Sequence, residues 1–76
     1  MNLFKVYASN ITPGKTKVSA NYFFNLNQLT SFYGCLTGST YLYLTFSSGE
    51  TYEVTDYKGI TRFCKLMNIT LDDLYN

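Results

Sequence analysis

The chain has 76 residues, enough for one small domain with a thin core. Eight Tyr and six Phe supply bulky side chains for that core, and only 14% of the residues are charged, against about a quarter in an average soluble domain. A strongly basic nucleic-acid-binding surface and an acidic DNA mimic are both excluded. Each needs a large excess of one sign of charge, and the formal net charge is +1. We therefore expect a single domain over residues 1–76.

The first third of the chain predicts an antiparallel hairpin. In residues 3–9 and 16–24, successive side chains fall on opposite sides in the pattern expected for strands with one face buried. Between them, Thr12–Lys15 contains Pro13 followed by Gly14, a pair that is typical of a turn.

A helix is predicted next, over residues 25–36. Asn25 is a suitable N-cap, and Gln28 three positions later completes a capping box. The apolar residues fall roughly on one helical face, and Gly34 or Gly38 would end the helix. Those apolar residues are Leu26, Leu29, Phe32, Tyr33 and Leu36.

A second hairpin is predicted from residues 41–46 and 50–55, which flank Ser47-Ser48-Gly49. A three-residue loop pairs Leu42 with Val54 and keeps apolar partners on one face, whereas a two-residue loop mixes the faces. The longer loop also ends on its glycine, where a left-handed residue forms the bulge. The residues left outside the core are Tyr41, Tyr43, Thr45, Thr51 and Glu53.

The last part of the chain predicts a helix followed by a helical turn. Asp56 or Thr55 can cap the helix, and Asn68 suits the left-handed residue that ends it. Thr70 with Asp73 forms a capping box for the final turn. The buried stripe of the helix consists of Ile60, Phe63, Cys64 and Met67.

These elements predict an α+β fold, a four-stranded antiparallel sheet with two helices on one face, in the order ββαββα with a short C-terminal helical turn. The predicted core consists of Phe4, Val6, Val18, Tyr22, Leu29, Leu42, Leu44, Phe46, Val54, Ile60, Phe63 and Met67.

The sequence predicts no enzyme, cofactor or metal site. Histidine is absent, and the five acidic residues fall at a turn, on an outer strand face and at helix starts. Cys35 and Cys64 lack a zinc-binding spacing and have no base to activate them, and we expect them to be buried thiols. Nothing at the N-terminus looks like a secretion signal and no apolar run approaches the ~20 residues of a membrane span, so we expect a cytoplasmic location.

Two segments resemble parts of known families. Thr40–Phe46, with alternating aromatics, resembles the RNP1 strand of RRM domains without its leading Lys/Arg-Gly, which implies that Tyr41 and Tyr43 stack on bases. Ile60–Leu74 resembles the closing segment of lambda-repressor-like helix-turn-helix domains. The upstream residues offer no counterpart to the recognition helix, so this second resemblance carries over no function.

We weigh two functions. In the first, exposed tyrosines form a docking patch on a host protein or protein complex. A chain rich in Asn, Tyr, Thr and Lys resembles bacteriophage accessory proteins, anti-CRISPR proteins among them, which implies an inhibitor that blocks a host enzyme or defence complex. In the alternative, the protein binds single-stranded nucleic acid weakly through tyrosine stacking and a basic helix face. Homodimerisation is compatible with both. The candidate partner-binding residues are Tyr41, Tyr43, Tyr57, Lys58, Arg62 and Lys65.

Overall fold

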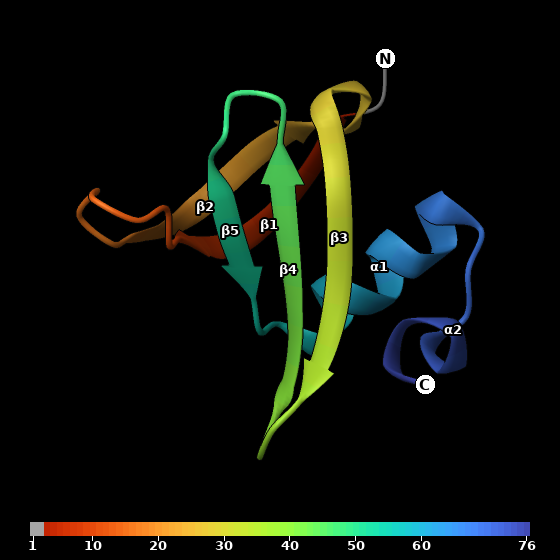
Figure 1. Ribbon diagram of the computed structural model, residues 1–76. Coiled ribbons are helices and arrows are strands. Elements are labelled where there is room, and N and C mark those ends of the chain that lie inside the picture. Colours follow the sequence, from red (N-terminus) through yellow and green to blue (C-terminus); the bar gives the residue numbers. More distant parts are fainter. Residues whose placement is uncertain (1–2) are drawn as a thin grey trace.

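A computed structural model describes residues 3–76, so the first two residues of the predicted domain lie outside the described part of the chain. It contains a five-stranded antiparallel sheet in the order β2-β1-β5-β4-β3, an α-helix and a short C-terminal helix (Figure 1). The elements are β1 (Leu3–Asn10), β2 (Val18–Asn25), the 3-10 turn η1 (Leu26–Gln28), β3 (Leu29–Leu36), β4 (Thr40–Phe46), β5 (Thr51–Val54), α1 (Tyr57–Met67) and α2 (Leu71–Tyr75).

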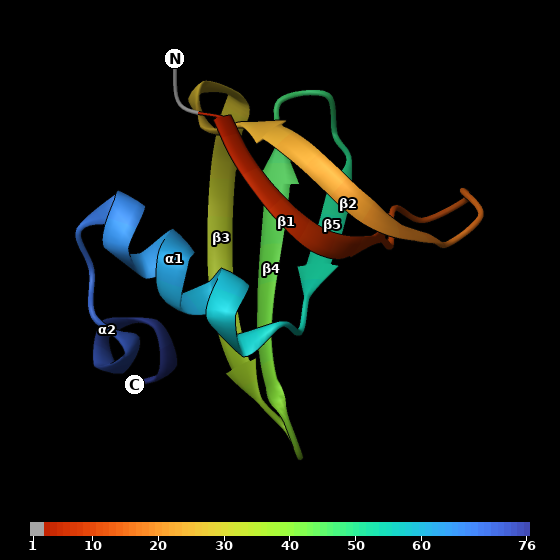
Figure 2. The same cartoon turned by 180° about the vertical axis from the view of Figure 1, so that it is seen from behind.

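The sheet consists of the β1–β2 hairpin and a second ribbon made of the successive hairpins β3–β4 and β4–β5, and the two parts cross at a large angle (Figure 1). β1 pairs with β2 along its whole length, and β3 pairs with β4 along nearly all of its own. The hairpins meet where β1 pairs with β5, through only two residue pairs, Ser9 with Glu53 and Asn10 with Tyr52. As Figures 1 and 2 show, the β1–β2 ribbon therefore turns away from β4 and β3, and α1 lies across the side that the two hairpins enclose.

The prediction of four strands in ββαββα order is wrong, because residues 25–36 do not form a helix. The Asn25 side chain does accept a hydrogen bond from the Asn27 N–H, at 3.0 Å, but the turn that it caps lasts only three residues. The chain then extends as β3, which pairs with β4 after a bulge between Leu29 and Ser31. Backbone pairing along a whole neighbouring strand outweighs a helical spacing of apolar residues that is only approximate.

The predicted register of the second hairpin is confirmed. Leu42 faces Val54, and the Phe46 N–H donates to the Glu50 carbonyl at 3.0 Å across a loop that ends on Gly49 with a φ of 90°. The signals that end the predicted α1 are confirmed as well. Asn68 is left-handed with a φ of 57°, and the Ile69 N–H donates to the Cys64 carbonyl at 3.0 Å.

The core lies between the inner face of the sheet and α1. Ile60, Phe63 and Cys64 of α1 pack against buried side chains of β1, β2, β4 and β5. Val18 is a wrong core prediction, because it pairs with Asn10 at the far end of the first hairpin and is 51% exposed. Three other predicted core residues are only partly buried at the margin of this core, namely Tyr22, Leu29 and Met67. Phe32, which was predicted on the apolar face of a helix, is partly buried there as well.

Candidate functional site

Three tyrosines line up on the outer face of β3 and β4. Tyr41 and Tyr43 alternate with the buried Leu42 and Leu44 along β4, so their rings point away from the core. Tyr33 of β3 lies directly across from Tyr43, with the two ring centroids 4.9 Å apart and the ring planes 28° from parallel. Tyr41 continues the stack at 6.1 Å from Tyr43. We call these three residues the tyrosine row.

The tyrosine row is held in place from both sides. The Tyr43 hydroxyl donates to the Glu53 carboxylate at 3.3 Å, and burial, followed by the charge of Glu53, raises the pKa of Tyr43. The backbone carbonyl of Tyr41 accepts a hydrogen bond from the Tyr75 hydroxyl at 3.0 Å, which ties α2 to β4. The row is therefore a largely preformed aromatic surface.

Tyr33 is the member of the row that the sequence prediction missed. Its side chain is 61% exposed, and cross-strand pairing places it beside Tyr43. The sequence offered one signal, because Ser31, Tyr33 and Cys35 occupy every second position and would share the outer face of a strand.

The basic residues of the predicted site lie elsewhere. Lys58, Arg62 and Lys65 are exposed on α1, and α1 covers the inner face of the sheet, opposite the tyrosine row (Figure 2). The guanidinium carbon of Arg62 lies 5.1 Å from the centroid of the Phe4 ring, at the edge of the core. Tyr57 is 55% exposed at the first position of the same helix. The structure thus brings Tyr41 and Tyr43 together and separates them from the three cations.

The two cysteines are both free thiols. Cys64 is buried, and its burial raises the thiol pKa, whereas Cys35 is only partly buried, contrary to the prediction that both are buried. Within residues 3–76, no three His, Cys, Asp or Glu side chains lie close enough together to hold a metal ion. The helices of this part of the chain also lack the length and apolar character needed to span a membrane.

The chain has no significant match to a protein-family model, a curated protein or a solved structure.

Proposed function

We propose that this protein is a binding module that docks on another protein through the tyrosine row. The observation that carries the proposal is the stack of Tyr33, Tyr43 and Tyr41 on an outer sheet face that no helix covers. Tyrosine offers a large contact area at a low cost in side-chain entropy, and it is enriched in protein interfaces. An ordered stack adds rigidity, which reduces what must be immobilised on binding.

A protein partner fits the row better than a nucleic acid does. The charged side chain that contacts the row is the Glu53 carboxylate, 3.3 Å from the Tyr43 hydroxyl, and an anion there repels phosphates. The alternative needs Lys58, Arg62 and Lys65 beside the stacked bases, and these cations lie on the helix that covers the opposite face. A single strand on the tyrosines would not reach them without wrapping around the domain.

Composition extends the proposal to the kind of partner. The resemblance to bacteriophage accessory proteins favours an inhibitor that covers the surface of a host enzyme or defence complex, anti-CRISPR-like in its mode of action. Such a protein would act in the cytoplasm of the host cell. The near-neutral charge favours surface blocking over DNA mimicry.

The experiment compares capture of proteins from a nuclease-treated bacterial lysate by the wild type and by the double variant Tyr41→Ala, Tyr43→Ala. We expect the wild type to retain a defined protein or complex and the double variant to lose it, because both anchoring rings are gone. The matched control is Tyr7→Ala, which removes a tyrosine that is 52% exposed on β1 and should leave capture intact.

Circular dichroism of each variant establishes that it is folded. Undiminished capture of the same partner by the folded double variant contradicts the proposal. Capture that disappears on nuclease treatment and falls steeply with salt supports the nucleic-acid alternative instead.

A further inference from the structure

A second candidate site lies at the opposite end of the sheet from α2, where the two hairpins approach each other. A cavity of about 300 Å³ opens there between the end of β2, η1 and the loop after β4. Its size is at the lower end of the range for small-ligand pockets. The wall is aromatic, formed by Phe23, Phe24, Phe46 and Tyr52, and Glu50 also lines the cavity.

The aromatic wall is rigid because its rings pack on one another. Phe24 stacks on Phe46 with the ring centroids 4.8 Å apart, and meets the Tyr52 ring edge-on at 4.6 Å. Tyr52 is in turn contacted by Tyr22 at 4.9 Å. Phe24, Phe46 and Tyr52 are each less than 9% exposed, so the wall exists before any ligand arrives.

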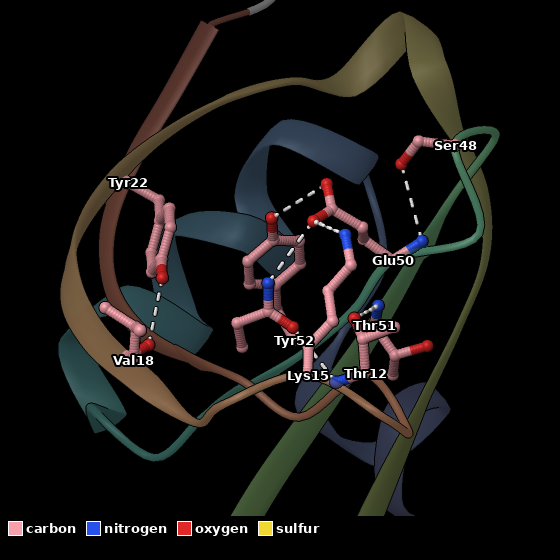
Figure 3. Close-up of polar contacts among 9 residues, drawn as sticks. Thr12, Lys15, Val18, Tyr22, Ser48, Glu50, Thr51 and Tyr52 are labelled. Atoms are coloured by element: carbon pink, nitrogen blue, oxygen red, sulfur yellow. Dashed lines mark hydrogen bonds and ion pairs between the residues drawn. The ribbon is translucent and has the colours of Figure 1, made fainter.

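Glu50 brings a negative charge to this wall. Its Oε2 accepts hydrogen bonds from Lys15 Nζ at 3.0 Å and from Asn10 Nδ2 at 3.3 Å (Figure 3). Its Oε1 accepts a hydrogen bond from the Tyr52 hydroxyl at 3.3 Å. The hydrogen bond from Lys15, aided by its charge, lowers the pKa of Glu50, so the carboxylate is ionised at neutral pH.

The ion pair with Lys15 shows that the Glu50 carboxylate accepts an ammonium group. Lys15 lies in the turn between β1 and β2, its side chain is 56% exposed, and it does not line the cavity. A solvent-exposed ion pair made by a long side chain is weak, so another ammonium group can displace it. The cavity also provides an apolar aromatic wall next to the charge of Glu50, and Lys15 does not use this wall.

We propose that this cavity binds the side chain of a lysine from a partner protein. The butyl stem lies against Phe24 and Phe46, and the ammonium group donates to Glu50 in competition with Lys15. Lysine is chosen because the cation that the Glu50 carboxylate already accepts is an ammonium group, that of Lys15. This site is independent of the tyrosine row, which lies on the outer face.

The test is an NMR titration of isotope-labelled protein with Nα-acetyl-lysine-N-methylamide at low salt. We expect saturable shifts at the backbone amides of the cavity, those of Asn25, Ser47 and Ser48. The matched probe is the norleucine analogue, which has the same stem without the ammonium group and should bind far more weakly. Equal shifts with both probes, or none with lysine, overturn the proposal.

Two substitutions should act in opposite directions. Glu50→Gln removes the charge at the cavity and should weaken lysine binding by about tenfold or more. Lys15→Met removes the internal competitor and should strengthen binding by about two- to fivefold. A merely structural role for the Lys15–Glu50 pair predicts no gain from Lys15→Met.

The charge-matched controls are Asp56→Asn and Lys17→Met, which change the net charge equally at exposed positions outside the cavity. Affinities that change as much in these controls as in the corresponding site variants overturn the proposal. The double variant Tyr41→Ala, Tyr43→Ala should bind the lysine probe like the wild type, so failure of the docking proposal and failure of this one are separate results.

Discussion

The two faces of the sheet carry the same kinds of side chain in opposite roles. On the inner face, Phe4, Phe24 and Phe46 are less than 9% exposed, with Phe4 against Phe63 of α1 and Phe24 stacked on Phe46. On the outer face, Tyr33 and Phe23 are more than 60% exposed. The aromatic content of this chain therefore does not indicate how much of it is core, since strand alternation assigns each ring either to stability or to the surface.

The largest expected effect comes from the inner face. Phe63→Ala should lower the free energy of unfolding by about 3–5 kcal/mol, because it leaves a cavity in a closed core. The Phe63 ring is fully buried, with centroids 5.0 Å from that of Phe32 and 5.8 Å from that of Phe4. Urea denaturation followed by circular dichroism gives the value. The outer-face counterpart Tyr33→Ala should cost about 1 kcal/mol or less, and equal losses would remove the distinction between the faces.

Gly34 lies where α2 covers the edge of the sheet. A Cβ at this position would lie 2.6 Å from the Tyr75 ring and 2.8 Å from the Leu74 carbonyl. Gly34→Ala should therefore push α2 away and cost about 1–3 kcal/mol. The measurement is the unfolding free energy together with amide hydrogen exchange in α2. Ser31→Ala, on the exposed face of the same strand, is the control, and undisturbed exchange in Gly34→Ala would contradict the packing described.

A further effect appears only in alkali and contrasts a covered tyrosine with an open one. Burial raises the pKa of Tyr75 to about 12, from an ordinary value of 10.0. The unfolded chain thus loses this proton first, so its contribution to stability is complete below pH 10 and is lost as the pH rises towards 12. Melting temperatures across this range should fall less steeply in Tyr75→Phe than in the wild type.

The control for the alkaline experiment is Tyr7→Phe. It removes a phenol that is 52% exposed and leaves Tyr75 in place, so the steep loss of stability above pH 10 should persist. An unchanged slope in Tyr75→Phe would mean that this hydroxyl is not held between α2 and β4.

Local signals in the sequence predicted the second half of the fold and failed in the middle. The register of β4 and β5 follows from a loop whose glycine takes the left-handed conformation, and the α2 capping box predicted from Thr70 and Asp73 is present. In residues 25–36 the apolar spacing fits a helix, and a bulge after Leu29 breaks the alternation of the strand. Pairing with β4 makes this segment a strand, and the residues of the segment alone do not reveal that pairing.

The candidate sites were predictable to different degrees. Tyr41 and Tyr43 follow from the hairpin register, so their outward direction was foreseen. Tyr33 depended on the strand that the sequence did not reveal. The ion pair of Lys15 with Glu50 joins two turns from different hairpins, and the cavity beside it depends on the crossing angle of those hairpins, so neither could be read from the order of residues.

The short junction between the hairpins decides how the two halves of the domain hold together. Only two residue pairs link β1 to β5, whereas Phe24 from the first hairpin packs on Phe46 and Tyr52 from the second. Apolar contact between aromatic rings therefore adds to the hydrogen bonds of the junction, among them that from the Ile11 N–H to the Thr51 carbonyl at 2.9 Å. Such contact weakens on cooling and carries a large heat-capacity change.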